Sequence, residues 1–299
     1  MKQSLEMKKP IEELIASLVY LFSSILTTLS NKYILSNLGF KMQYLLVGAQ
    51  SLTIVMGLLI LRGVGLIEFR LTNFRKWMVP SLLLTVMIFS GSKSLYYLPI
   101  SLYTLFKNSS IVVVALLEQY LFKKRIGGLS YISFILMIIS SYTGNSSDVI
   151  LNIGYVWILT NVLSTTAYVL SLKAVVDMNS KAKAESVYYS NLISLPVLIF
   201  LSMLFDEKDV SVFSFKVLMW ILISSLCAFF TSFSTAWTLN VLSSTALSMI
   251  GALNKSLGSF AGIFALGEVI NGQKIFSLLL GSLASAIYSY DISFRKRSE

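Results

Sequence analysis

The chain has 299 residues, of which 56% are hydrophobic and 13% are charged, whereas a soluble domain carries roughly 25% charged residues. A globule of this length cannot hide so much apolar surface from water, so the composition excludes a soluble enzyme and a disordered chain. It indicates an integral membrane protein that has the lipid bilayer as a partner. The formal net charge of +10 would suggest nucleic acid binding in a soluble protein, but here the positive charges gather in short loops between apolar segments.

The residues that common catalytic and metal sites need are missing. The chain contains no histidine, and its one cysteine, Cys227, lies within an apolar segment. This composition excludes Ser-His-Asp and Cys-His catalysis, a metal bound by histidine, and an intrachain disulfide. We therefore expect no enzyme activity, no cofactor and no metal.

A helix needs about 20 apolar residues to cross a bilayer, and the sequence offers ten such segments. Residues 1–13 mix lysine with glutamate and resemble neither a cleavable signal nor a transit peptide, so we expect a cytoplasmic N-terminal segment followed by a retained first helix. The sequence thus predicts an all-α membrane protein, with residues 1–299 as a single polytopic transmembrane domain. The expected helices run Leu14–Leu35, Tyr44–Leu61, Trp77–Tyr97, Ile100–Phe122, Leu129–Ser146, Ile153–Leu172, Val187–Phe205, Val217–Leu239, Ser244–Leu266 and Ile275–Ser293.

An even number of helices puts both ends of the chain on the same side of the membrane. With the N-terminus in the cytoplasm, the cytoplasmic segments hold 16 lysines and arginines, and the opposite loops hold 6. The positive-inside rule therefore predicts two cytoplasmic termini, with a short basic tail over residues 295–299. Asn145 begins a glycosylation sequon on the other side, close to the membrane.

Two lysines, Lys107 and Lys255, lie inside expected helices that are five helices apart. Each is followed by an acid near the end of the same helix, Glu118 in the first case and Glu268 in the second. This pattern suggests two five-helix repeats, over residues 14–147 and 153–294. An odd number of helices in each repeat forces opposite orientations, which is the inverted-repeat arrangement of many transporters.

A lysine inside a membrane segment costs at least ~2.5 kcal/mol on insertion scales. Lys173, near a helix end, can extend its ammonium to the interface, but Lys107 and Lys255 lie well inside their helices. Either each pairs structurally with a carbonyl or an acid, or both line a water-filled cavity and bind a phosphate-bearing anion. Polar and small neighbours favour the cavity: Asn108, Gly251, Asn254 and Ser256.

A polar and aromatic cluster, Tyr188-Tyr189-Ser190-Asn191, opens the seventh expected helix, and Pro196 follows it. Tyrosine is enriched at membrane interfaces, so the cluster is either an interfacial belt or part of a binding site. Its spacing alone does not decide between the two. Tyr20 in the first helix and Ser232 in the eighth are unremarkable by themselves.

Several of these stretches occur together in one known family. They are Tyr20-Leu-Phe-Ser-Ser-Ile-Leu, Tyr103-Thr-Leu-Phe-Lys107-Asn108, the 188–191 cluster, and Gly251-Ala-Leu-Asn254-Lys255. With them the chain resembles the nucleotide-sugar transporters of the drug/metabolite transporter superfamily, most closely the Golgi GDP-mannose transporter group. The Gly251–Lys255 motif is the most specific element, and it is characteristic of transporters for GDP-linked sugars.

The resemblance implies ten helices around a central cavity and a protein of the Golgi membrane. It implies alternating access, with cytoplasmic GDP-sugar exchanged for luminal GMP. Lys255 and Lys107 would neutralise the diphosphate, while base and sugar would be contacted by Asn191, Ser190, Asn254 and Tyr20. The resemblance also places Tyr189, Gly251 and Ser232 in the substrate site, and Asn108 and Ser256 join them as polar neighbours of the two lysines.

Ser190 departs from the family motif, which has an asparagine there. Serine is shorter and lacks the paired donor and acceptor of an amide, so the sugar carried and the base preference stay open. A transporter of a UDP-sugar or another phosphate ester is therefore the alternative hypothesis. A hypothesis from a different functional class is a membrane scaffold that transports nothing. The sequence leaves a homodimer open.

Overall fold

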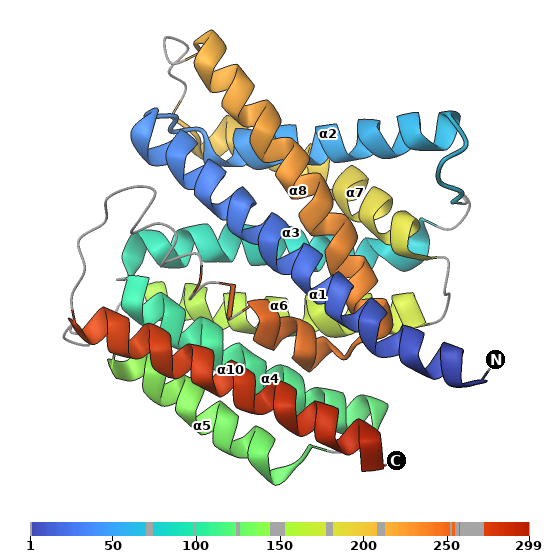
Figure 1. The fold of residues 1–299 in the computed structure, drawn as a ribbon. Helices are drawn as coiled ribbons and strands as arrows, with labels where there is room; N and C mark the ends of the chain where they lie inside the picture. Colours follow the sequence, from blue (N-terminus) through green and yellow to red (C-terminus); the bar gives the residue numbers. More distant parts are fainter. Residues whose placement is uncertain are drawn as a thin grey trace. The chain divides into compact units, whose positions relative to one another are not determined.

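The structure, a computed structural model, describes residues 2–69, 74–98, 100–123, 126–143, 153–177, 182–207, 213–251, 253–254, 257 and 272–298. These residues form helices joined by turns, and no strand occurs among them. The helices are α1 (Lys2–Lys32), the π-helical turn η1 (Tyr33–Asn37), α2 (Gln43–Gly63), α3 (Arg75–Tyr97), α4 (Ile100–Phe122), α5 (Gly128–Thr143), α6 (Gly154–Asp177), α7 (Ala182–Phe205), α8 (Phe215–Val241) and α10 (Gly272–Ser298) (Figure 1). Residues 244–251 are helical as well.

Among the described residues, five segments are long and apolar enough to cross a membrane. They are Ile11–Leu35, Gln43–Gly63, Gly154–Val176, Ala184–Phe205 and Phe215–Val241. On α1, Leu18, Phe22 and Leu26 are 44%, 63% and 52% exposed, and their four-residue spacing puts them on one face of the helix. An exposed apolar face of this kind suits lipid. The prediction of an all-helical membrane protein is therefore confirmed.

Two junctions between consecutive helices have local causes in the sequence. Pro99 stands between α3 and α4; a proline lacks the backbone N–H and disfavours helical geometry at the residue before it. After α8, Leu242 takes an extended conformation (φ −119°, ψ −176°), which stops the helix before residue 244. The predicted separation of these helices is confirmed at both junctions. The ninth expected helix lies mostly outside the described residues.

The chain divides into two compact units, each built from two stretches of sequence. Unit 1 comprises Met1–Thr85 and Ser171–Ser243, and unit 2 comprises Val86–Leu170 and Ser244–Glu299. Each unit therefore takes helices from both halves of the chain. The expected boundary between the two repeats, near residues 148–153, falls largely outside the described residues.

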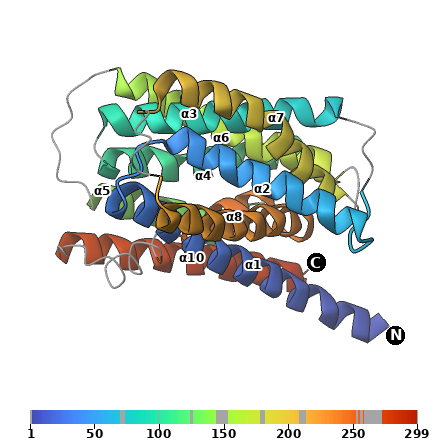
Figure 2. The ribbon, with the colours of Figure 1, turned by 90° about the horizontal axis from the view of Figure 1, so that it is seen from above.

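In unit 1, α1 packs along α8, and α2 packs against α7 and α8 (Figures 1 and 2). Hydroxyl pairs join α1 to α8: Thr27 and Thr231 lie 3.0 Å apart, and Ser23 and Ser234 lie 3.5 Å apart. Small polar residues at such contacts let helix backbones approach closely and hydrogen-bond across the interface. The apolar core at one end of the unit consists of Ile34, Phe40, Met42, Leu46 and Val217.

In unit 2, α5 and α10 pack side by side through serines (Figure 1). Ser133 Oγ donates to the Ala284 carbonyl at 2.7 Å. Ser140 and Ser277 each donate to the other's carbonyl, at 2.6 and 2.5 Å. Helix α4 packs against α5.

Acidic side chains bind the first turns of helices in both units. Asp206, just after α7, accepts the backbone N–H groups of Tyr44 and Leu45 at the start of α2, at 3.2 and 2.9 Å. Asp291 of α10 accepts the backbone N–H of Ser130 at 3.2 Å and its hydroxyl at 2.5 Å, at the start of α5. The first N–H groups of a helix have no partner within the helix, and a carboxylate satisfies them while complementing the helix dipole.

Candidate functional site

Lys107 lies on α4, well inside the helix, as the sequence predicts. Its ammonium donates to the Asn161 side-chain oxygen at 2.9 Å and to the Thr165 hydroxyl at 2.7 Å, both on α6. Both of these acceptors are neutral oxygens of side chains. The two bonds fix the direction in which the ammonium points.

Asn161 holds that acceptor in place. It is 1% exposed, and its Nδ2 donates to the Met87 carbonyl at 2.6 Å, which turns Oδ1 toward Lys107. Gly91 of α3 lies against the same amide: a Cβ at this position would stand 3.0 Å from Asn161 Nδ2 and 3.5 Å from the Tyr103 hydroxyl. The absence of a side chain at Gly91 thus permits the close approach that the Asn161 contact needs.

Sequence reasoning missed Asn161 and Thr165. A signal was present, since an asparagine and a threonine four residues apart share one face of the sixth helix, although that helix carries other hydroxyl side chains too. Polar groups inside a membrane helix are costly without partners. Neither residue, however, reveals from sequence that its partner is a lysine on another helix.

The helix beginning at residue 244 carries Gly251, which is half-buried, and Asn254, which is 7% exposed. Glu118 of α4 accepts the backbone N–H groups of Ser244 and Thr245 at 2.9 and 2.8 Å, and also the Thr245 hydroxyl. Glu118 is itself only 2% exposed. The start of this helix is therefore bound to the helix that bears Lys107.

The other residues predicted for the substrate site in this region are Asn108, Lys255 and Ser256. Asn108 is half-buried beside Lys107 on α4. Lys255 and Ser256 lie outside the described residues, as do Glu268 and the sequon residue Asn145.

The 188–191 cluster is buried in unit 1. Tyr188, Tyr189, Ser190 and Asn191 are 8%, 4%, 6% and 8% exposed, which argues against an interfacial belt of tyrosines facing lipid headgroups. The rings of Tyr188 and Tyr189 meet edge to face, with centroids 5.2 Å apart. Asn191 Nδ2 donates to the Val187 carbonyl at 2.8 Å, which fixes the direction of its amide. The cluster is thus preorganised within the protein.

The remaining predicted residues, Tyr20 and Ser232, lie on α1 and α8, which pack against each other in unit 1. Both side chains are half-buried. The predicted residues consequently form two groups: Tyr20, Ser232 and the 189–191 segment in unit 1, and Lys107, Asn108, Gly251 and Asn254 in unit 2.

Unit 1 also contains a buried polar network that sequence reasoning missed. Gln50 Nε2 donates to the Asn31 side-chain oxygen and to the Ser224 hydroxyl, both at 2.7 Å, and Ser224 donates to Asn31 at 2.5 Å. These three residues come from α2, α1 and α8, so the network joins three helices. Such interhelical hydrogen bonds stabilise membrane helix bundles.

Lys173, which the sequence places near a helix end, is buried within unit 1. It is 5% exposed, and its ammonium donates to the carbonyls of Leu239 and Leu242 at 2.5 and 3.0 Å, at the end of α8. The last carbonyls of a helix have no partner within it, and a cation there also complements the helix dipole. Lys173 thus binds the end of a helix, whereas Lys107 binds side chains of α6.

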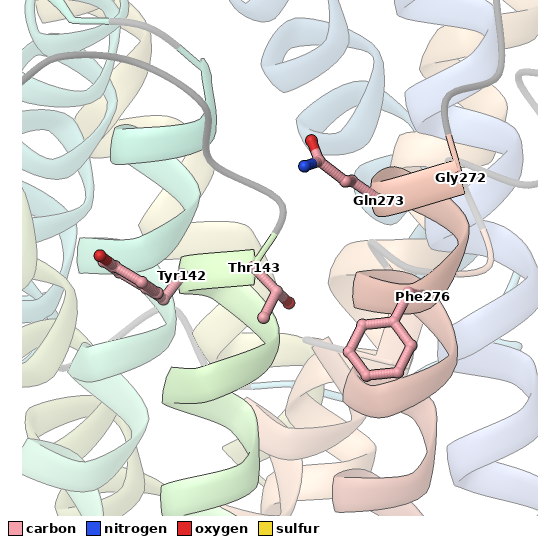
Figure 3. Close-up of a pocket in the computed structure, with 5 residues that line it drawn as sticks. All are labelled: Tyr142, Thr143, Gly272, Gln273 and Phe276. Carbon is pink, nitrogen blue, oxygen red and sulfur yellow. The ribbon is translucent and has the colours of Figure 1, made fainter.

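An open hollow of about 520 Å³ lies at the ends of α5 and α10, where Thr143 and Phe276 stand on facing helices (Figure 3). It is lined by Tyr142, Thr143, Gly272, Gln273 and Phe276. Because none of the described lining residues is a predicted substrate-binding residue, we do not assign the substrate to it.

In the described part of the chain, no group of three His, Cys, Asp or Glu side chains lies close enough together to hold a metal ion. The observations together define a polytopic α-helical membrane protein with buried polar networks and an oriented lysine inside one of its helices.

Comparisons with known proteins identify the family. The chain is 32% identical to the GDP-mannose transporter of Schizosaccharomyces pombe over 98% of this chain and 89% of that protein. It is 34% identical to GDP-mannose transporter 2 of Vanderwaltozyma polyspora, over 92% and 91% of the two chains. No protein-family model matches the chain.

A crystal structure of another protein superposes with a TM-score of 0.71, covering 92% of this chain and 96% of that one at 13% identity, which shows a shared fold. The chain belongs to the GDP-mannose transporter family. This confirms the resemblance seen in the sequence, and the transporter names agree with the expectation that the chain is not an enzyme.

Proposed function

We propose that the protein is a nucleotide-sugar antiporter that moves GDP-mannose, or a related GDP-sugar, into the Golgi lumen in exchange for GMP. The observation that carries this proposal is the similarity to GDP-mannose transporters over 98% of the chain. A nucleotide diphosphate carries charge that lipid excludes, so its passage requires a polar path that opens alternately to each side. The process is binding and release, with no covalent step.

The geometry around Lys107 supports a diphosphate substrate. The ammonium lies inside a membrane helix and is aimed by two neutral acceptors, Asn161 and Thr165. In this proposal Lys107 and Lys255 bind the phosphates. Base and sugar are contacted by Asn254 and Tyr20, together with Tyr189, Ser190, Asn191 and Ser232, while Asn108, Gly251 and Ser256 complete the site.

The proposed architecture is ten transmembrane helices in two inverted five-helix repeats, with both termini in the cytoplasm. In such a fold each helix of one repeat has a counterpart five helices later, and contacts between non-equivalent helices occur in reciprocal pairs. The packing supports this: α2 lies against its counterpart α7, and α5 against α10. Contact between α1 and α8 has its reciprocal in the Asn161–Met87 bond between α6 and α3.

The directions of the paired helices support inversion as well. Asp206 follows the end of α7 and binds the start of α2, so these two helices run antiparallel. Asp291 lies in the later part of α10 and binds the start of α5, which gives the same relation. Counterparts that run antiparallel are what a two-fold axis in the membrane plane produces.

A UDP-sugar transporter remains the second candidate because Ser190 replaces the amide of the family motif at a buried position, 6% exposed. Competition binding separates the two candidates. With purified protein and labelled GMP, we expect displacement by GDP-mannose at low concentrations and no comparable displacement by UMP or UDP-sugars. Displacement by uridine compounds alone would reject the guanine preference and support the second candidate.

A further inference from the structure

The buried carboxylate of Glu118 joins two segments that carry predicted substrate contacts. Glu118 lies on α4, eleven residues after Lys107, which places both on one face of the helix and roughly 16 Å apart along its axis. Its carboxylate binds the N–H groups of Ser244 and Thr245 and the Thr245 hydroxyl. All of these residues belong to unit 2.

We propose that Glu118 is a positioning residue for substrate binding: it fixes the helix that begins at residue 244, and with it Asn254, relative to Lys107. The inference rests on the proposed function. It differs from a role in neutralising substrate, since a carboxylate carries the wrong charge to bind a diphosphate.

Distances along the helices support the inference. Asn254 is nine residues beyond Thr245, roughly 14 Å at the rise of an α-helix. If α4 and the 244–251 helix run antiparallel, as counterparts in the proposed repeats, both helices leave the Glu118 junction in the same direction. Lys107 and Asn254 then lie at nearly equal depths, and Glu118 sets the offset between them.

Three features make this junction stiff. Glu118 is 2% exposed, so water does not compete strongly for its oxygens. Its two carboxylate oxygens accept the backbone N–H groups of two consecutive residues, at 2.9 and 2.8 Å, so rotation of the helix start would break at least one of these bonds. The extended Leu242 ends α8 just before, which leaves these N–H groups without partners in a preceding turn.

The chain offers a matched control in Asp291, which binds the N–H and hydroxyl of Ser130 at the start of α5 in the same unit. No predicted substrate residue lies on α5. Removing either carboxylate charge should lower stability, but only Glu118 should affect ligand affinity. The comparison therefore separates positioning of the site from general support of the fold.

The experiment measures the Kd for GMP and for GDP-mannose, together with the thermal midpoint, in the wild type, Glu118→Gln and Asp291→Asn. We expect about a tenfold rise in Kd for Glu118→Gln, equivalent to about 1.4 kcal/mol, because the amide's NH₂ group cannot accept a hydrogen bond. Asp291→Asn should show a similar loss of thermal stability with a Kd within about twofold of the wild type. Glu118→Asp keeps the charge and should recover part of the affinity.

Thr245→Val provides a milder variant that removes only the hydroxyl donor, and it should raise the Kd by about threefold. It carries the test if Glu118→Gln does not fold. Two results would overturn the positioning role alone, provided that the wild type binds the ligands. One is an equal change of Kd in Glu118→Gln and Asp291→Asn. The other is an unchanged Kd in both Glu118→Gln and Thr245→Val. Failure of the wild type to bind either guanine compound would overturn the proposed function and this inference with it.

Discussion

Replacing Lys107 by methionine separates a substrate-binding lysine from a structural one, and Lys173→Met is its control. Both lysines lie in helices, and both donate two hydrogen bonds to neutral oxygens. Their partners differ. Lys107 binds two side chains of α6, whereas Lys173 binds the terminal carbonyls of α8, which have no intrahelical partner.

The expected stability changes follow from these contacts. Removing Lys107 relieves a membrane-insertion cost of at least ~2.5 kcal/mol. It also removes two interhelical hydrogen bonds, which average about 0.6 kcal/mol each in membrane proteins and reach about 1.7 kcal/mol. It leaves the buried Asn161 side-chain oxygen without this donor as well, so the gain and the losses largely offset and the change in stability should be small. Lys173→Met relieves the same insertion cost but leaves two carbonyls, of Leu239 and Leu242, unsatisfied at about 1–3 kcal/mol each, so it should lower the thermal midpoint more than Lys107→Met.

Substrate affinity should show the opposite order, with the larger loss in Lys107→Met. A charge-assisted hydrogen bond to phosphate is worth about 1.5–3 kcal/mol, so Lys107→Met should raise the Kd for GDP-mannose by about 10- to 100-fold. Lys173→Met, where it remains folded, should change the Kd by less than about twofold. The assay is equilibrium binding with thermal unfolding on the same preparations. Retained affinity in Lys107→Met, or an equal loss in both variants, would refute the assignment of Lys107 to the phosphates.

Three further predictions test the surrounding packing. Gly91→Ala places a Cβ 3.0 Å from Asn161 Nδ2, so we expect a lower thermal midpoint and weaker GMP binding; an unchanged Kd would separate Asn161 from the site. Gln50→Leu removes two hydrogen bonds of the three-helix network and should cost roughly 1–3 kcal/mol in unfolding free energy without altering Kd. Glu185→Gln breaks the 3.2 Å ion pair with Lys76; because the Glu185 carboxylate is buried and poorly screened by salt, its destabilisation should persist in about 1 M salt.

The sequence predicts those features that depend on local pattern. Apolar segment length predicts the helices, and Pro99 marks the break between α3 and α4 because a proline changes the backbone of its own neighbours. The position of Lys107 inside α4 follows from counting residues along one helix. Each of these inferences uses residues close together in the chain.

Partners on other helices could not be predicted in the same way. Lys107 meets Asn161, 54 residues away, and Glu118 meets Ser244, 126 residues away. Which side chain faces a buried cation or carboxylate depends on how helices pack, and several serines, threonines and asparagines were equally eligible. Lys173 shows the limit most directly: the sequence places it near a helix end but does not reveal that carbonyls at the end of α8 accept from its ammonium.

The most direct test of the central claim is uptake of labelled GDP-mannose by proteoliposomes loaded with GMP, compared with empty and UMP-loaded vesicles. The exchange mechanism predicts rapid uptake with internal GMP and little uptake in either control. Uptake that is independent of internal GMP would contradict antiport. No uptake of GDP-mannose by folded, correctly inserted protein would contradict the proposed substrate.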